Sequence, residues 1–280
     1  MPLQIDRTFE MPSTPVVLTK IIQVLDDDSA SAQQLEDLIL HDPSLSARIL
    51  KLANSAFYSF RTEVKTLSHA IALLGMGLVK SLAIGVTIFE SFTKGVKQEG
   101  NQINRLWMHS FGTGLITQDI WSRRARTKKE IDFAFLSGLL HDMGQVVLFK
   151  DSPHTYGRLF SREKTSADPS LCAMETELFG VDHTYVGSSL AKQWGFPADL
   201  VTILRKHHSA SDTKLALPAV VSVADTMVKQ TRIGFDGDNR EPHDFAKLME
   251  LLAIDPAERE KIHALAEKKH PEIEKFFELA

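Results

Sequence analysis

The chain has 280 residues, of which 43% are hydrophobic, enough to bury a substantial core in one large domain or two smaller ones. A formal net charge of -4 excludes a global attraction to nucleic-acid phosphates, so any such binding needs a local basic patch. The single cysteine excludes internal disulfides, and the first residues lack the apolar core of a signal peptide; we therefore expect a cytoplasmic protein.

Helix start signals recur along the chain. Ser31 and Gln34 form a predicted capping box, and Asp42 precedes a proline that suits a first helical turn. Apolar residues between such signals are spaced by three and four, whereas alternating strand patterns and Asn-Gly hairpin turns are lacking. The sequence therefore predicts an all-α protein.

Changes in polarity divide the predicted helices into segments. We expect the following boundaries: a loose arm over residues 1–10, a compact group of short helices over 11–92, a polar connector from Thr93 to Asn104, a second helical part over 105–230, a loop over 234–240 and charged peripheral helices over 241–280. The second helical part carries all the candidate site residues.

The stretch from Ala70 to Phe89 is almost wholly apolar and about as long as a membrane span. Lys80 near its centre would cost about 2.5–3.5 kcal/mol on insertion, and Gly75 and Gly77 weaken a continuous helix. We expect two short buried helices that meet near Gly75, and no membrane segment.

The doublet His141-Asp142 ends an apolar helix, and an adjacent imidazole and carboxylate are half of a metal site. His109 and Asp225 stand in apolar-periodic contexts, where a polar residue at core depth needs a reason. Imidazole nitrogens and carboxylate oxygens bind Fe, Mn, Zn or Ni, and helices can bring distant ligands together. We predict that these four residues share a pocket for a divalent transition metal. Taken alone, His109 also fits a hydrogen-bonded core histidine.

Three further histidines, His183, His207 and His208, are candidates for the same pocket. Two alternatives stay open, because Asp182-His183 can simply begin a helix and His208 can face solvent. Glu175 and Glu177 can cap or form ion pairs instead of binding a metal. The other histidines are expected to be structural: His41, His69, His154, His243, His263 and His270.

Several motifs follow one another in a recognisable order: Leu38–Ser55, Ala70–Gly75, Leu139–Gly144, Glu175–His183 with Val186-Gly187, Trp194–Pro197 and His207-His208. In this order and spacing, the chain resembles the HDOD family of bacterial signalling domains over roughly residues 12–210. The resemblance implies an HD-domain-like multi-helical bundle with an additional N-terminal helical subdomain. It also implies a regulatory or output role.

The resemblance extends to metal chemistry. In the HD phosphohydrolase superfamily, the positions of the four predicted ligands hold a divalent cation whose bound water attacks a phosphoester. The positions of His183, His207 and His208 match those that bring a second metal in the related HD-GYP phosphodiesterases.

Two departures from the catalytic relatives weaken the case for an enzyme. Gln145 stands where HD phosphohydrolases commonly place a lysine that neutralises phosphate charge, and no Gly-Tyr-Pro segment follows His208. The leading hypothesis is therefore a bacterial-type signal-transduction protein that binds another signalling protein and has weak or no turnover. The rival is a metal-dependent phosphohydrolase that acts on nucleotides or cyclic dinucleotides.

Two surface features have two interpretations each. The basic run from Arg123 to Lys129 fits a solvated helix end better than a nucleic-acid site, so the sequence has no strong nucleic-acid signal. The segment from Asn54 to Tyr58 can cap a helix C-terminus through left-handed asparagine geometry, or it can border a groove for a partner protein.

Overall fold

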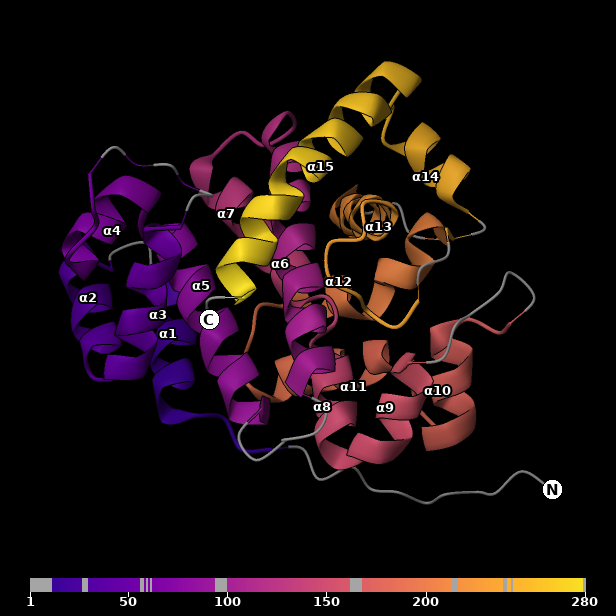
Figure 1. Cartoon of the computed structure of the whole chain (residues 1–280), viewed down its shortest axis with the longest axis horizontal. Coiled ribbons are helices and arrows are strands. Elements are labelled where there is room, and N and C mark those ends of the chain that lie inside the picture. Colours follow the sequence, from indigo (N-terminus) through magenta and orange to yellow (C-terminus); the bar gives the residue numbers. More distant parts are fainter. Residues whose placement is uncertain are drawn as a thin grey trace.

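The structure, a computed structural model, describes residues 12–26, 30–55, 58, 60, 62–93, 100–161, 168–212, 216–238, 241–242 and 244–278. Helices and their connections account for these residues, and no β-strand occurs among them (Figure 1). The predicted all-α fold is confirmed. The predicted arm over residues 1–10 lies outside the described part of the chain.

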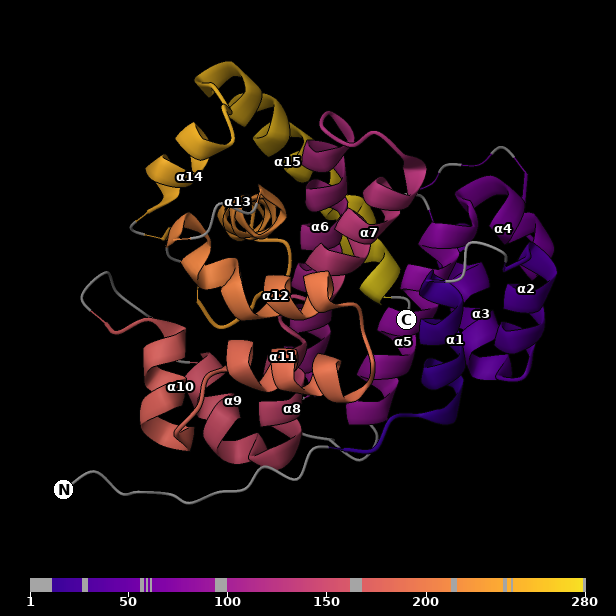
Figure 2. The ribbon, with the colours of Figure 1, turned by 180° about the vertical axis from the view of Figure 1, so that it is seen from behind.

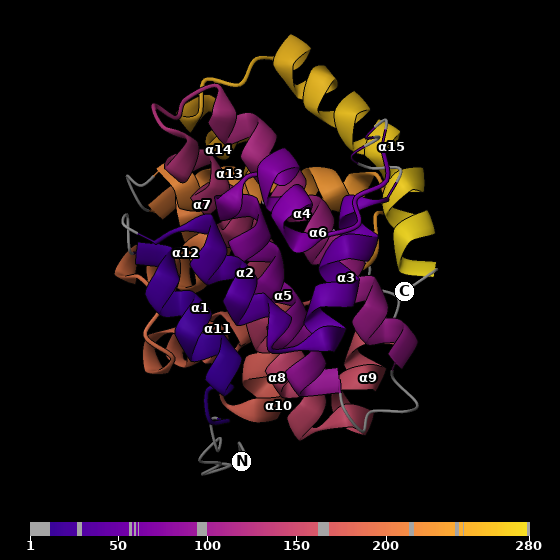
Figure 3. The ribbon, with the colours of Figure 1, turned by 90° about the vertical axis from the view of Figure 1, so that its left-hand side faces the viewer.

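Five helices form the N-terminal group, on the left in Figure 1 and facing the viewer in Figure 3: α1 Val16–Asp26, α2 Ala32–Leu40, α3 Pro43–Ala53, α4 Leu67–Leu74 and α5 Met76–Thr93. The predicted caps are present. The Ser31 side chain accepts from the Gln34 amide in a full capping box, and Asp42 accepts from the amides of Ser44 and Leu45. These bonds satisfy N–H groups that a helix start leaves unpaired.

The apolar stretch is broken where the sequence predicts. Gly75, with φ of +87°, separates α4 from α5, and the two helices are bent by 118°. Lys80 is 5% exposed, and its ammonium donates to the Val24 carbonyl at 2.5 Å. That carbonyl belongs to the last turn of α1, which lacks intrahelical donors and carries the negative end of the helix dipole. Lys80 therefore links α5 to α1 through this hydrogen bond.

The remaining elements are helical as well: α6 Gly100–Ser122, α7 Lys128–Leu140, α8 Met143–Asp151, α9 Pro153–Ser161, α10 Leu171–Phe179, α11 His183–Gln193, α12 Ala198–Lys206, the 3-10 helix η1 His207–Asp212, α13 Ala216–Gln230, α14 Phe245–Leu251 and α15 Pro256–Glu278. α6 begins at Gly100, inside the predicted polar connector. Figure 1 shows α15 crossing over α6, where Phe277 meets the rings of Trp107 and Phe111.

Glycines let the central helices approach backbone to backbone. A Cβ at Gly138 of α7 would lie 2.7 Å from the Gly114 Cα of α6. A Cβ at Gly144 of α8 would lie 2.0 Å from the His183 carbonyl oxygen of α11. Such contacts are closer than any side chain allows. They bring α6, α7, α8 and α11 near enough for short polar side chains to meet at their ends.

Candidate metal centre

The predicted site residues come from six elements. In chain order, they are α6 for His109, the end of α7 for His141, the start of α8 for Asp142, the start of α11 for His183, η1 for His207 and His208, and the middle of α13 for Asp225. The structure brings all seven together in the core. They form two sets that share Asp142. The first set is His109, His141, Asp142 and Asp225; the second set is Asp142, His183, His207 and His208.

In the first set, each imidazole Nε2 lies near both carboxylates. The His109 Nε2 is 2.9 Å from the Asp225 Oδ1, and the His141 Nε2 is 3.1 Å from the Asp142 Oδ2. The cross distances, His109 Nε2 to Asp142 Oδ2 and His141 Nε2 to Asp225 Oδ1, are both 3.8 Å. Ligand atoms at about 2.0–2.2 Å from one ion lie about 3.0–3.5 Å from one another. Small shifts would therefore let these four atoms share an ion, and their role as ligands stays a prediction.

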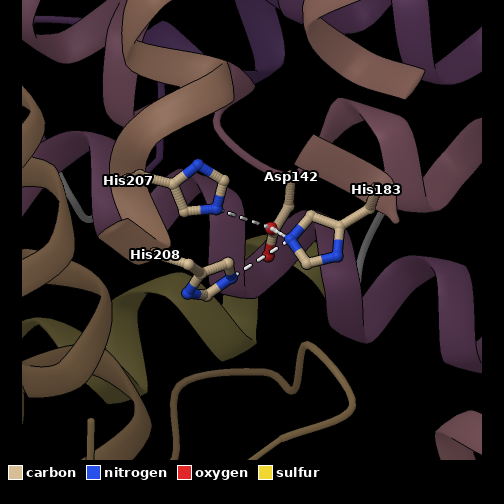
Figure 4. A group of neighbouring side chains, drawn as sticks. All are labelled: Asp142, His183, His207 and His208. Atoms are coloured by element: carbon tan, nitrogen blue, oxygen red, sulfur yellow. Dashed lines mark hydrogen bonds and ion pairs between the residues drawn. The ribbon is translucent and has the colours of Figure 1, made fainter. Parts of the chain in front are cut away.

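The second set converges on the other oxygen of the shared carboxylate (Figure 4). The Asp142 Oδ1 lies 3.3 Å from the His183 Nε2 and 3.6 Å from the His207 Nε2. The His208 Nε2 lies 3.1 Å from the His183 Nε2, so His208 faces its neighbours in the cluster. Asp142 thus offers one oxygen to each set, which is the arrangement of a bridging carboxylate.

Main-chain oxygens orient two of the imidazoles. The Nδ1 of His141 lies 2.7 Å from the Gly138 carbonyl oxygen, and the Nδ1 of His207 lies 2.9 Å from the Leu204 carbonyl oxygen. A carbonyl can only accept, so Nδ1 is the donor in both rings, and in the neutral ring the lone pair is on Nε2. When they are neutral, both rings therefore turn the Nε2 lone pair toward the centre, the form that binds metal ions.

Glu175 orients the third imidazole. Its Oε2 accepts from the His183 backbone amide at 2.9 Å and lies 2.6 Å from the His183 Nδ1, while the Tyr156 hydroxyl donates to Oε1. Burial lowers the pKa of His183, but the carboxylates of Glu175 and Asp142 outweigh it and raise that pKa to about 9. Glu175 is thus an ion-pair partner of His183, whereas Glu177 is exposed on α10.

Atoms aimed at the centre are buried and lack hydrogen-bond partners within the described chain: the Nε2 of His141 and His207, both Asp142 carboxylate oxygens and the Asp225 Oδ1. These atoms lie close to one another, but their contacts do not have the geometry of hydrogen bonds. Each such group costs about 1–3 kcal/mol when it is left unsatisfied. A cation in each set would satisfy these atoms, so the residues fit a metal.

The electrostatics of the centre also favour a bound cation. Burial would raise the pKa of both carboxyls, but the neighbouring imidazoles hold the pKa of Asp142 well below its usual range, and Lys229 and His109 do so for Asp225. Without an ion, the Lys229 ammonium and the imidazolium of His183 offset the negative charge of the buried carboxylates. A divalent ion would supply that positive charge in place of the imidazole proton.

Sequence reasoning missed Lys229 and its second partner, Asp236. The Lys229 Nζ lies 2.8 Å from the Asp225 Oδ2 and 2.8 Å from the Asp236 Oδ2, and the lysine side chain is only 6% exposed. The four-residue spacing from Asp225 to Lys229 on α13 was the available signal, because such pairs face each other on a helix. Lys229 occupies one carboxylate oxygen of Asp225 and leaves the other for the first set.

The loop over residues 231–238 packs against α6 beside the centre. Gly234, with φ of +64°, lies so close to α6 that a Cβ would be 2.2 Å from the Arg105 carbonyl oxygen and 2.4 Å from the His109 nitrogen. The Phe235 amide donates to the same Arg105 carbonyl at 3.0 Å. Only glycine fits this contact. With the loop in place, every residue of the first set is 0–1% exposed.

A family model described as HDOD domain matches residues 11–210. The chain belongs to the HDOD family. The HDOD domain is similar to an uncharacterized protein of Treponema pallidum (strain Nichols), with 23% identity over 204 residues that make up 73% of this chain and 39% of that protein. The chain thus spans about two fifths of the length of that relative.

Solved structures share the HDOD fold. A Shewanella amazonensis protein provisionally named a phosphohydrolase is 23% identical with a TM-score of 0.73, and the match covers 96% of this chain and 94% of that one. A Marinobacter aquaeolei protein provisionally named a signal transduction protein is 20% identical with a TM-score of 0.78, covering 96% and 60% of the two chains. These likenesses establish the fold.

Part of the centre lies beyond the matched HDOD segment. Asp225, Lys229 and Asp236 all follow residue 210, where the family match ends. α13 and the loop after it therefore complete a site that the matched helices only begin. The helix also packs directly on α6, η1 and α7.

The histidines expected to be structural lie outside both sets. The His41 Nδ1 contacts the Asp37 carbonyl oxygen at 2.5 Å, and His263 and His270 lie within ion-pair distance of glutamates one turn further along α15. His69 and His154 also lie away from the cluster, and His243 is outside the described residues.

The N-terminal HDOD motif has a structural explanation. Asn54 caps α3 with φ of -88°, so the left-handed geometry expected for it is wrong. Its Nδ2 donates to the carbonyls of Leu50 and Val64, at 2.9 and 2.7 Å, and its Oδ1 accepts from the Val64 amide at 2.7 Å. These bonds to both sides of the loop determine its closure without a special backbone conformation.

Residues of the basic run form ion pairs within the protein. Arg123 pairs with Asp119 and Glu258, and Lys128 pairs with Asp132.

Length and composition make Lys128–Asp151 a candidate membrane span, yet 89% of its most apolar window is buried. The bent α4–α5 pair meets the same test only when its two helices are joined.

Proposed function

We propose that this HDOD protein is a cytoplasmic signal-transduction protein that binds another signalling protein, with a metal centre that serves structure or sensing. The observation that carries this proposal is the burial of the first set, 0–1% exposed beneath the 231–238 loop. Catalytic metal sites keep a ligand position open to substrate. A phosphoester could contact these buried residues only if the segments that cover them moved.

The charge around the centre also disfavours phosphoester turnover. Gln145 is 0% exposed and neutral at the position where catalytic relatives carry a lysine. Lys229 does not replace that lysine, because Asp225 and Asp236 already engage its ammonium on two sides. Loss of one electrostatic contact to the transition state commonly lowers the rate by about 10²–10³.

The donor set suits Fe, Mn, Ni or Zn, since it combines imidazole nitrogens with carboxylate oxygens. When bound, such an ion would supply positive charge and Lewis acidity. In a sealed site, the charge stabilises the packing of α6, α7, α8 and α13 around Asp142 and Asp225. Metal binding to the folded state alone would then stabilise the HDOD domain by mass action.

A metal-dependent phosphohydrolase is the second candidate. The bridging position of Asp142 favours it, because two-metal phosphodiesterases use a carboxylate between ions about 3.5–4 Å apart. The name of the Shewanella amazonensis protein is in line with this candidate. In this case, the segments that cover the first set would have to move before each turnover on a nucleotide or cyclic dinucleotide.

One set of measurements separates the two candidates. The wild-type protein, His141→Ala and the surface control His263→Ala are purified without chelator, analysed for metal content, and assayed on bis(4-nitrophenyl) phosphate with Mn²⁺. We expect bound metal in the wild type and control, loss of metal in His141→Ala, and no turnover above the His141→Ala level. Efficient Mn²⁺-dependent turnover in the wild type and control, lost in His141→Ala, would replace the regulatory proposal by the enzymatic one.

A further inference from the structure

A group of metal-ligating side chains that includes a thiol lies beside the centre, between α10 and α11. Cys172, Glu175 and His183, here called the Cys172 cluster, each place one ligand atom within 4.8 Å of the other two. Figure 2 shows α10 at the edge of the molecule, with α11 next to it. Sulfur, imidazole nitrogen and carboxylate oxygen are the three kinds of ligand that Zn²⁺ takes in proteins.

Local structure determines this arrangement. Cys172 and Glu175 are three residues apart on α10, so both side chains lie on one face of the helix. Gly180, with φ of +78°, ends α10 in a left-handed turn, and Asp182 caps α11, whose first residue is His183. The Glu175 Oε2 accepts from the His183 amide at 2.9 Å, which holds the start of α11 against α10. The three ligands are thus brought together by the backbone.

His183 has one nitrogen for each of the two neighbouring sites. Its Nε2 lies 3.3 Å from the Asp142 Oδ1, whereas its Nδ1 is turned away from Asp142 and lies 2.6 Å from the Glu175 Oε2 (Figure 4). An ion bound to Nδ1 would take the place of the proton between the imidazole and Glu175. The Nε2 would then carry the proton of the neutral ring and donate it to Asp142.

The thiol is the outer member of the cluster. Glu175 and His183 are 0% exposed, whereas Cys172 is half-buried. Burial, and then the carboxylates of Glu175 and Asp182, hold the pKa of the Cys172 thiol well above its usual range. The same negative surroundings favour a cation beside the sulfur, and a thiol that coordinates such an ion loses its proton. An ion from solvent can therefore reach the sulfur, and the surrounding charges attract it.

We propose that the Cys172 cluster binds a thiophilic divalent ion of the Zn²⁺ class through the Cys172 sulfur, a Glu175 oxygen and the His183 Nδ1. Binding releases the thiol proton and the Nδ1 proton to solvent. A neutral imidazole has one nitrogen lone pair, so an ion here and an ion of the second set exclude each other at His183. The exclusion rests on the proposed metal centre, whereas the Cys172 site itself does not.

The single cysteine of the chain makes the site visible by absorbance. A sulfur-to-metal charge-transfer band reports Cys172 and no other residue, because the two sets of the centre contain only histidine and aspartate. The full chain is titrated with Co²⁺, a spectroscopic substitute for Zn²⁺, without oxygen. We expect a saturable charge-transfer band in the near ultraviolet that Cys172→Ser abolishes. Absence of the band in the wild type would overturn the proposal.

A matched pair of variants distinguishes a three-ligand site from an ion held by the thiol alone. Glu175→Gln should raise the Co²⁺ dissociation constant by about 10–100-fold, the loss that even an outer-shell partner commonly causes. Glu177→Gln changes an exposed glutamate of the same helix and should bind like the wild type. Equal affinity in the two variants would show that Glu175 is no ligand and would refute the site.

Alkylation of the wild-type protein gives a test that needs no variant. At about ten times its dissociation constant, Zn²⁺ should slow the reaction of Cys172 with iodoacetamide about tenfold, because only the ion-free thiol reacts. Mg²⁺, which prefers oxygen ligands, should not slow it. In urea the three ligands separate, so the same Zn²⁺ concentration should no longer protect the thiol. Equal protection of the folded and the unfolded chain would contradict the site even if Glu175→Gln fails to fold.

Two further measurements separate this site from the main centre. Folded His141→Ala lacks a predicted ligand of the first set and should keep the cobalt band; its loss there would contradict an independent site. Mn²⁺, which suits imidazole and carboxylate rather than thiolate, should raise the apparent Co²⁺ dissociation constant of the band by about fivefold or more in the wild type but not in His208→Ala. A constant value in the wild type would refute the exclusion and leave the Cys172 site standing.

Discussion

Removal of the Lys229 ammonium should destabilise the metal-free protein more than any surface charge change. The Lys229→Met substitution keeps most of the apolar stem and deletes only the charge. Asp225 and Asp236, each 1% exposed and each 2.8 Å from the Lys229 Nζ, would then face each other without a cation. Breaking a buried pair in this way costs about 3–5 kcal/mol.

The structure supplies an internal control for this magnitude. Lys128 pairs with Asp132 at 2.6 Å, also one helical turn apart, but its side chain is 62% exposed. Lys128→Met removes a solvated ammonium and leaves one unpaired carboxylate, not two, so it should cost less than Lys229→Met. For a chain of this size, the loss of about 3–5 kcal/mol in Lys229→Met corresponds to a melting temperature that is lower by about 6–15 °C.

Thermal and urea unfolding with a chelator measure both variants, and Lys229→Met/Asp236→Asn closes a double-mutant cycle. Asparagine removes one of the two uncompensated charges, so the double variant should recover part of the loss. Mn²⁺ should stabilise Lys229→Met more than the wild type, because the ion replaces the missing charge. A Lys229→Met cost equal to that of Lys128→Met would show that the buried network contributes nothing beyond a pair with one solvated partner.

Other predictions address pH, packing and the N-terminal loop. The pKa of His183 is raised to about 9 in the folded state, above the usual 6.5, so its contribution to stability is complete below pH 6.5 and is lost as the pH rises through about 9; melts with chelator from pH 6 to 10 should show this decline, and His183→Gln should flatten it. Gly144→Ala places a Cβ 2.0 Å from the His183 carbonyl oxygen, so it should abolish metal binding measured by elemental analysis, even where circular dichroism shows retained helix. Asn54→Ala removes three hydrogen bonds and should cost about 1–3 kcal/mol in urea unfolding, without a change in metal content.

Local signals in the sequence predict much of the fold because their causes are local. The capping box at Ser31, the Asp42 cap and the break at Gly75 each depend on a few neighbouring residues, and each is present in the structure. α6 starts earlier than the sequence predicts, because its polar first residues were interpreted as part of a connector. Asn101 and Gln102 lie within α6, where a polar first turn is compatible with a helix.

Sequence spacing could identify the histidines and aspartates of the centre, but not the network that encloses them. In the sequence, Lys229 is an ordinary charged residue of a helix, and Asp236 is a residue of a glycine-rich loop. The two residues meet only because the loop folds back onto α6. The contact of Gly234 with the backbone of His109 determines that fold, and it joins residues more than a hundred positions apart. The spacing of apolar residues within a single helix or loop cannot predict a contact between residues so far apart in the sequence.

The helix ends explain why these side chains are available to a metal at all. Asp142 is the N-cap of α8, yet its carboxylate makes no capping hydrogen bond. The positive end of the helix dipole still favours its charged form, so Asp142 remains ionised while both oxygens face the two sets. At α11, Asp182 accepts from the Tyr185 amide and caps the helix, which leaves the His183 side chain to turn inward. The capping and the metal-facing roles are thus divided between neighbouring residues. A substitution of Asp182 should consequently weaken α11 before it affects the centre, whereas a substitution of Asp142 should affect the centre first.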